Sequence, residues 1–386
     1  MIGLAGVVGH PRGVPLQNRY TWGAVRIINE SRRWQSEKEN TVRTLSLVAL
    51  FLLLPSLALA APVGKVTKAN GSVFYKNGAT ASYLPLSVNG RVEEGGWLKT
   101  GRNGWAELTL SDGSRFTLAN DTELEVASFS VGTSRREGAF HLAGGKLRAA
   151  VVKLAGKQTD IKVRSATATA GIKGTEFLML SRGPANVLFG AEGSVSVSAA
   201  DGGSQPLSAD TLVQTTRGYQ PLAPVKVEPG TPLAAARAGF EAATGASPPA
   251  DWDTADQLGD IIARWNINHG HYLADSGKYD EALHAFQLAL DLTETAGVRV
   301  DALLERGAVY GRFLRNPEAA LAEYLLVLER YPELPQAETA LFTAGQVQFQ
   351  MGLADQARAR FSQYLERYPA GRYRGSATTL LKLLEK

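Results

Sequence analysis

The sequence predicts an antiparallel all-β sandwich followed by an α-helical solenoid, and three observations support this. Residues 62–222 alternate apolar and polar side chains in short runs between glycine-rich turns, which is typical of half-buried strands. Residues 223–257 are rich in proline, alanine and glycine, which indicates a semi-flexible linker with a short helix at Leu233–Ala243. Residues 258–386 repeat one helical pattern three times, which favours stacked helix pairs.

The clearest hairpin of the β part is expected over residues 105–118, where WAELTL and RFTL flank the turn SDGS. Asp112 and Gly113 form a favoured turn pair because glycine tolerates positive φ. The turn explains Asp112, so we do not interpret it as a catalytic carboxylate. The run Val66–Tyr75 is expected to contain an Asn-Gly turn at residues 70 and 71. Further strands are expected at Thr122–Val126, Gly138–Leu142, Gly145–Leu154, Asp160–Val163, Thr175–Leu180, Asn186–Phe189, Ser194–Val197 and Thr211–Gln214.

The run RSATATAGIKGTEF, residues 164–177, joins two expected strands through small residues. Glycine and alanine let backbone segments approach closely, so this run predicts a sharp turn inside a β-core. We interpret it as a structural turn with a buried phenylalanine as its anchor. Its key residues are Gly171, Gly174, Thr175, Glu176 and Phe177.

A family resemblance rests on six runs that occur in order, namely VEEGGWLKTGRNGWAEL, DGSRFTL, TELEV, HLAGGKLRAAV, AGIKGTEF and NVLFGAEGSVSV. Together they resemble the FecR domain family over about 110 residues. The resemblance implies a periplasmic β-domain that is not an enzyme. Its best-known members are membrane-spanning regulators that relay signals from outer-membrane transporters to sigma factors and carry a cytoplasmic domain. Only about 43 residues precede the apolar run of this chain, too few for that domain.

Residues 1–60 are expected to be a leader that contains a secretory signal peptide. Residues 44–60 are apolar and end in Ala-Leu-Ala, which predicts cleavage after Ala60 and a periplasmic location. The alternative is an uncleaved inner-membrane anchor, which Pro55 and the short length of the run disfavour. Cleavage would leave no stable membrane span. Residues 1–41 would make the positively charged region of a signal peptide unusually long. We therefore interpret translation as starting near residue 42 and predict no fold for residues 1–41.

The helical part contains three units centred on Ala282, Ala320 and Ala357, which are 38 and 37 residues apart. An aromatic residue follows each alanine by four positions, so both lie on one helical face. These units resemble tetratricopeptide repeats, helix pairs that bury their core by stacking on neighbours. Residues Arg372–Lys386 are expected to form the capping helix.

The resemblance implies a groove lined by the first helix of each repeat. Exposed arginines and aromatics there would suit a peptide of an envelope protein. For the phenylalanines at 313 and 349, burial between repeats is the equal alternative. By repeat position, the residues expected in the groove are Arg264, His271, Arg312, Phe313, Phe342, Gln346 and Phe349.

Composition excludes several classes of chemistry. Cysteine is absent, and His269 and His271 point to different sides of a helix, so no metal site or cofactor is expected. The net charge of +4 lies entirely in residues 1–60, which hold seven Lys or Arg and three Glu. The neutral remainder argues against a nucleic-acid partner.

The sequence therefore predicts a periplasmic, non-enzymatic binding or scaffold protein. Its β-domain would sense a ligand or partner, and its repeats would dock an envelope protein. Two alternatives stay open: a membrane-anchored FecR-type signal transducer that regulates a sigma factor, and an envelope glycan-binding protein. The possible further partners are thus a glycan or a transporter-linked protein.

Overall fold

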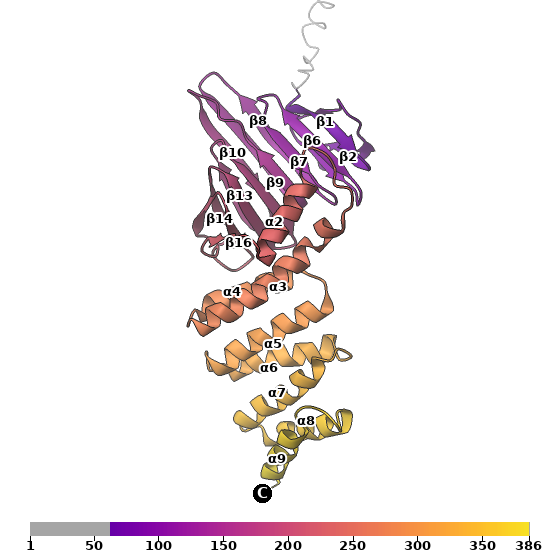
Figure 1. The fold of residues 1–386 in the computed structure, drawn as a ribbon, viewed down its shortest axis with the longest axis vertical. Coiled ribbons are helices and arrows are strands. Elements are labelled where there is room, and N and C mark those ends of the chain that lie inside the picture. The colour runs from indigo at the N-terminus through magenta and orange to yellow at the C-terminus, as the bar shows by residue number, and fades with distance from the viewer. Residues whose placement is uncertain (1–61, 386) are drawn as a thin grey trace, which may run out of the picture. The chain divides into compact units, whose positions relative to one another are not determined.

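The computed structural model describes residues 62–385, which form one compact unit, and strands precede helices along the chain (Figure 1). The expectations for the leader lie outside the described residues. The strands are β1 (Gly64–Asn70), β2 (Val73–Asn77), β3 (Leu84–Pro85), β4 (Arg91–Val92), β5 (Gly96–Thr100), β6 (Trp105–Leu110), β7 (Arg115–Leu118), β8 (Glu123–Val131), β9 (Arg135–Ala150), β10 (Gln158–Arg164), β11 (Ala168–Ile172), β12 (Glu176–Arg182), β13 (Ala185–Glu192), β14 (Ser194–Ala199), β15 (Ser204–Ser208), β16 (Thr211–Thr215) and β17 (Val225–Lys226).

The strands form two sheets that share β9. The first sheet has the order β4-β1-β6-β7-β9-β12-β13-β16-β17. The second has the order β3-β2-β5-β8-β9-β10-β11-β14-β15. Every strand before β9 in the chain lies on one side of it, and every later strand lies on the other. The predicted sandwich is confirmed, and among these pairs only β9 with β10 is parallel.

Strand β9 changes sheets at a pair of glycines, Gly144 and Gly145. Residues 135–144 pair with β8 and β10, whereas residues 145–150 pair with β7 and β12. Gly145 has φ of 104°, and a Cβ added there would lie 2.4 Å from the Cα of Thr122. Only glycine fits this crossing. The sequence predicted two separate strands here, because the glycine pair resembles a turn.

The space between the two sheets is filled by the inward side chains. Phe116, Phe140 and Phe177 are fully buried, and the rings of Phe116 and Phe140 have centroids 4.5 Å apart. Strand β12 is also buried on its other face, since Leu178 and Leu180 belong to a second cluster outside the sandwich. A strand covered on both sides has a continuous apolar run instead of strict alternation.

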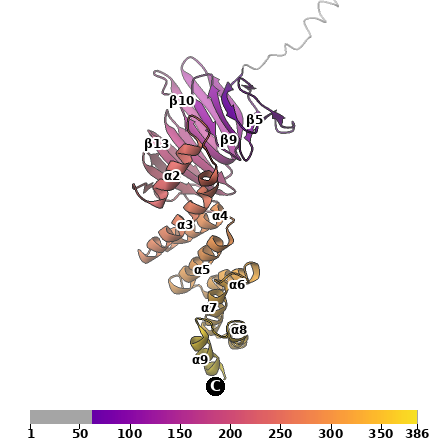
Figure 2. The same ribbon diagram turned by 45° about the vertical axis from the view of Figure 1, so that its right-hand side comes forward.

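The outer cover of the first sheet comes from the segment expected to be a linker. Helix α2 (Pro232–Ala243) lies against the sheet in both views (Figures 1 and 2), and Phe240 packs edge-on against Phe189, with ring centroids 6.5 Å apart. The proline-rich composition is compatible with this helix because Pro232 occupies its first turn and Thr231 caps it. Helix α2 is therefore part of the core and coincides with the short helix expected at Leu233–Ala243, whereas none of residues 245–254 is buried.

The remaining helices pair along the chain as the repeat pattern predicts, and α9 follows the last pair as a cap. No helix within the described residues has the length and apolar character needed to span a membrane. The helices are α3 (Asp253–Asp275), α4 (Tyr279–Leu292), α5 (Ala296–Arg312), α6 (Pro317–Arg330), α7 (Ala337–Gln350), α8 (Ala354–Arg367) and α9 (Arg374–Leu384).

In each repeat, the two helices approach closely because each of them has a small residue at the contact. The repeat-defining Ala282, Ala320 and Ala357 are fully buried on the second helix. The aromatic residue four positions after each alanine packs its ring against a glycine of the first helix. A Cβ added to that glycine would lie 2.6–2.8 Å from a ring carbon. The three pairs are Gly270 with Phe286, Gly307 with Tyr324 and Gly345 with Phe361.

Replacing Gly345 with alanine is expected to lower the free energy of unfolding by about 1–3 kcal/mol, because the ring of Phe361 must move. The matched control is Gly375→Ala, since no atom lies within 4 Å of a Cβ at that position in α9. The control is expected to leave stability unchanged or raise it, through the helix propensity of alanine. Urea unfolding of both variants checks this, and equal stabilities would contradict the packing described.

Buried hydrogen bonds join the sheets to the helices. The side-chain amides of Gln214 on β16 and Asn266 on α3 exchange two hydrogen bonds of 2.9 and 2.8 Å, and both residues are buried. Thr216 donates a 2.6 Å hydrogen bond to Asp291 at the end of α4. Buried amides need such partners. The sheet and the first repeat are therefore held together by specific polar contacts as well as apolar packing.

Candidate binding surfaces

The first candidate surface lies on α3 and α5, and we call its four exposed residues the repeat face. Arg264 and His271 are exposed on α3, Arg312 is exposed on α5, and Phe313 follows α5 with 42% of its surface exposed. His271 Nδ1 lies 3.6 Å from Glu305 Oε2 on α5, so adjacent first helices contribute to one surface. Partial burial raises the pKa of Glu305.

Two features of the repeat face bear on recognition. The ring of Phe313 stacks on Tyr279 of α4, with centroids 4.9 Å apart and an angle of 16° between the planes. The stack holds an exposed aromatic in a fixed position, which is how rigid anchors work at interfaces. Arg312 makes no ion pair among the described residues. Its guanidinium is therefore available to a carboxylate of a partner.

The other three residues expected in the groove lie elsewhere. Phe342 is only 4% exposed and stacks on Tyr373, which immediately precedes α9, with ring centroids 4.4 Å apart and an angle of 1°. Phe349 packs against the same cluster, and Gln346 is half-buried. The structure thus corrects the expectation for Phe342, because the start of the capping helix covers it.

The second candidate surface surrounds the expected Gly-Thr-Glu-Phe turn. Gly174 has φ of 87°, and Lys153 lies against it, since an added Cβ would be 2.6 Å from the Lys153 Cγ. Phe177 is fully buried, as an anchor would be, and Glu176 begins β12. Gly171 instead lies within β11, outside the turn.

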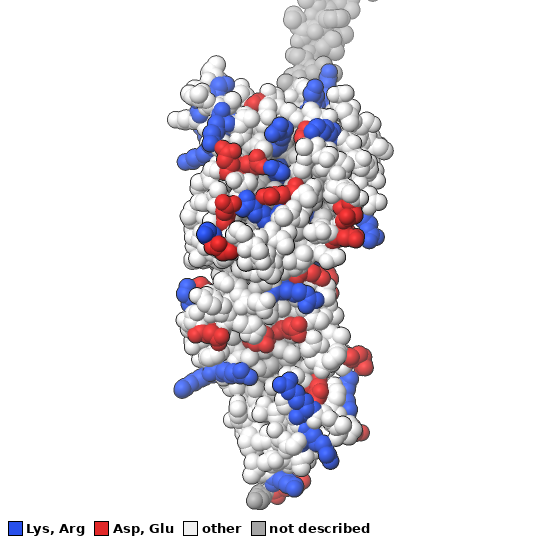
Figure 3. Space-filling model, viewed as in Figure 1, with Lys and Arg blue, Asp and Glu red and all other residues white. Residues whose placement is uncertain are grey.

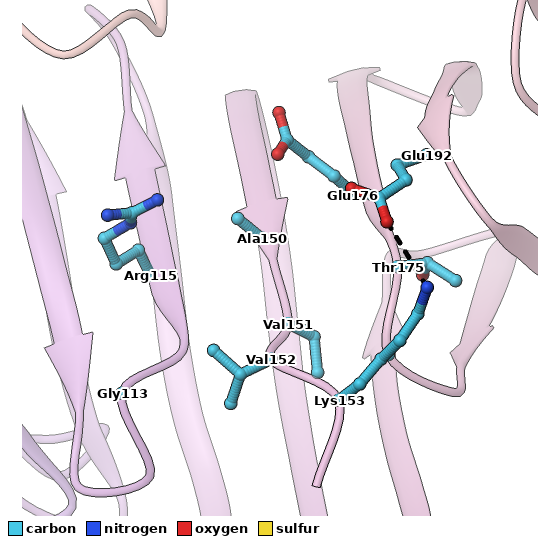
Figure 4. Close-up of a pocket in the computed structure, with 10 residues that line it drawn as sticks. Gly113, Arg115, Ala150, Val151, Val152, Lys153, Thr175, Glu176 and Glu192 are labelled. Carbon is cyan, nitrogen blue, oxygen red and sulfur yellow. Dashed lines mark hydrogen bonds and ion pairs between the residues drawn. The ribbon is translucent and has the colours of Figure 1, made fainter.

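This turn forms one wall of a hollow of about 340 Å³ at the ends of the central strands β7, β9 and β12 of the first sheet (Figure 4). The floor is apolar, and the opposite wall comes from the turn between β6 and β7. We call this hollow the turn pocket. It is lined by Gly113, Arg115, Ala150, Val151, Val152, Lys153, Gly174, Thr175, Glu176 and Glu192.

Strand register explains why these residues meet. Arg115 of β7 and Glu176 of β12 both pair with Ala150 of β9, so the small alanine separates the two charged side chains. Arg148 Nε donates a 2.7 Å hydrogen bond to Glu176. Lys153 Nζ lies 3.3 Å from Glu192 Oε1. Sequence reasoning missed this pocket because it depends on the order of strands that are distant in the chain.

A buried ion pair supports the wall of the turn pocket. Arg136 of β9 is fully buried, and its Nη1 lies 2.6 Å from Asp112 Oδ2. Its Nη2 donates hydrogen bonds to the carbonyl of Val152 and to the hydroxyl of Thr159. Asp112 also accepts a 2.8 Å hydrogen bond from the amide of Ser114. The turn aspartate therefore has a second, structural partner that no local pattern indicated.

Charged groups of both signs are interspersed on the face of the molecule shown in Figure 3. Among the described residues, no cluster of three or more His, Cys, Asp or Glu has a metal-binding arrangement. What the two candidate surfaces offer is charge, aromatic area and hydrogen bonds, which are the elements of non-covalent recognition.

The fold and these surfaces define a β-sandwich domain joined to helical repeats. Residues 97–196 match the FecR protein family, and residues 339–371 match a tetratricopeptide repeat, which confirms both resemblances. No curated protein has significant sequence similarity to this chain.

Three solved structures match parts of this chain. A candidate anti-sigma factor from Parabacteroides distasonis is 16% identical, with a TM-score of 0.29 over 34% of this chain, which spans 59% of that protein. The second TPR domain of human RPAP3, solved with an HSP70 peptide, is 17% identical, with a TM-score of 0.28 over 33% of this chain and 98% of that domain. The Yersinia enterocolitica translocator chaperone SycD is 16% identical, with a TM-score of 0.28 over 34% of this chain and 93% of that protein.

Proposed function

We propose that this protein is a periplasmic, non-enzymatic scaffold whose repeats dock an envelope protein and whose β-domain binds a ligand or second partner. The observation that carries the docking role is the repeat face. It combines an exposed aromatic fixed by stacking with an arginine that has no ion-pair partner among the described residues. Such anchors dominate the binding energy of protein interfaces. A segment of a partner with an acidic and an apolar side chain would complement them.

Replacing Arg312 with glutamate is expected to reduce recovery of a cross-linked envelope partner about tenfold or more, because an anchor becomes repulsive toward an acidic segment. Phe313→Ala should act in the same direction, because it removes the stacked ring. The matched control is Arg330→Glu, an exposed arginine in the last turn of α6, on a second helix. Recovery is measured by quantitative mass spectrometry after cross-linking in intact envelopes.

Equal recovery by the repeat-face variants and the control would contradict docking at this surface. If the wild-type chain and both repeat-face variants bind purified peptidoglycan equally well, the glycan-binding alternative is favoured instead. Phe342 is unsuitable as a test position because its ring lies in the core, where truncation would destabilise the last repeat.

The periplasmic part of the proposal predicts that the purified mature chain begins at Ala61. Cleavage after the Ala-Leu-Ala run would release it from the membrane. Mass spectrometry of the intact protein from an envelope preparation measures the N-terminus. A chain that retains residues 44–60 and sediments with membranes would favour the anchored signal-transducer alternative.

A further inference from the structure

The turn pocket contains a polar group that its surroundings leave unsatisfied. Thr175 is 6% exposed, and its Oγ1 is buried with no hydrogen-bond partner among the described residues. Buried hydroxyl groups almost always have a partner. Thr175 also lines the pocket, so an atom of a ligand there could provide the missing acceptor.

The pocket also contains a cation with no intramolecular partner. Arg115 is exposed at one wall and makes neither an ion pair nor a side-chain hydrogen bond among the described residues. Figure 4 shows Arg115 and Glu176 on opposite sides of Ala150. Glu176 is itself held by Arg148, so it does not neutralise Arg115 directly.

Lys153 provides a second cation that can be released. Its ion pair with Glu192 joins side chains that are 67% and 71% exposed, and exposed pairs are weak. The lysine lies against Gly174, the residue before Thr175. Exchange of Glu192 for a ligand anion would let the ammonium pair with that anion instead.

We propose that the turn pocket binds a carboxylate group. The fork of Arg115 matches two carboxylate oxygens, Lys153 adds a second positive charge, and the Thr175 hydroxyl donates a hydrogen bond. The charged residues that line the pocket, Arg115, Lys153, Glu176 and Glu192, sum to zero, and Arg148, which lies outside the lining and pairs with Glu176, brings the total to +1. This balance matches a single negative charge better than a phosphate dianion, which the two carboxylates would repel.

The apolar floor limits what else the ligand contains. Ala150 and Val152 present methyl groups beside the buried Val151, so a small apolar substituent next to the carboxylate would be buried there. An α-amido acid with a short side chain has this chemistry. It could be a free small acid or the C-terminal residue of a polypeptide.

A methyl-NMR titration of the full chain tests the proposal, with N-acetyl-alanine as the probe and N-acetyl-alaninamide as its uncharged match. Saturable shifts are expected for the methyl groups of Ala150, Val151, Val152 and Thr175 with the acid but not with the amide. Arg115→Gln is expected to weaken binding of the acid about tenfold, since a charge-assisted hydrogen-bond pair is lost. The control Arg102→Gln changes an exposed loop arginine that does not line the pocket and should leave the titration unchanged.

Shifts that are equal for acid and amide, absent for both, or unaltered by Arg115→Gln would overturn the proposal. So would tighter binding of inorganic phosphate than of the acid. Thr175→Val preserves volume and should also weaken binding. A hexapeptide with a capped N-terminus and a free C-terminal alanine identifies the natural ligand. If it binds more tightly than N-acetyl-alanine, the ligand is the end of a polypeptide, and if it binds equally well, the ligand is a small acid. The proposal rests on the proposed ligand binding by the β-domain. If the pocket binds no carboxylate but the repeat face still cross-links to a partner, the docking role stands.

Discussion

Replacing Asp112 with alanine is expected to lower the free energy of unfolding by about 3–5 kcal/mol, because it leaves the charge of Arg136 buried and unpaired. Arg136 is fully buried and lies 2.6 Å from the aspartate. The loss of the hydrogen bond to the Ser114 amide adds to the effect. Chemical unfolding followed by far-UV circular dichroism measures it.

A double variant separates the unpaired charge from general damage to the turn. Asp112→Ala combined with Arg136→Met removes both charges and is expected to be more stable than Asp112→Ala alone. Asp355→Ala is the control, since that carboxylate is 96% exposed in its pair with Arg358 and should contribute little. A double variant that is less stable than the single one would show that the buried charge is not the source of the loss.

Stability is expected to fall between pH 6.5 and pH 4 because of His284. This histidine on α4 is 3% exposed and stacks on Tyr219, with ring centroids 4.5 Å apart. Burial lowers its pKa from 6.5 to about 4. The unfolded chain therefore takes up a proton in this window that the folded chain does not. The stability that is present above pH 6.5 is lost as the pH falls, by up to about 3 kcal/mol at 1.36 kcal/mol per pKa unit.

Comparing the wild-type chain with His284→Phe isolates this contribution. Phenylalanine can keep the stack on Tyr219 but cannot titrate, so its stability should decline less steeply over the same window. Carboxylates titrate in both proteins, and their effect cancels in the difference. Parallel curves of unfolding free energy against pH would contradict the role assigned to this histidine.

The repeats were predictable because each one carries its own signal. The alanines at 282, 320 and 357 recur at a near-constant period, and their helical spacing to the next aromatic is local. The interhelical glycines at 270 and 345 could have been found in the same way, as glycines that recur twelve residues before the alanine. Phe342 could not be placed, because its burial depends on Tyr373 and the capping helix.

The β part shows the same division. The hairpin around Asp112 was predictable from alternation and its turn, but the partner of that aspartate lies 24 residues away on another strand. The cover provided by α2 had one unused signal. The consecutive apolar residues Leu178, Met179 and Leu180 indicate a strand buried on both faces. The turn pocket had none, since it arises only when β7, β9 and β12 become neighbours.

The position of β9 in both sheets has a consequence for the chain while it is being made. Half of each sheet precedes β9 in the sequence and half follows it. In a nascent polypeptide that ends just beyond Ala150, one edge of β9 would have unpaired backbone hydrogen-bonding groups along the whole strand, because its partners there have not yet been synthesised. Unpaired edges of that kind invite aggregation and proteolysis. Synthesis must therefore proceed well past the midpoint of the β-domain before the nascent chain is protected from aggregation and proteolysis.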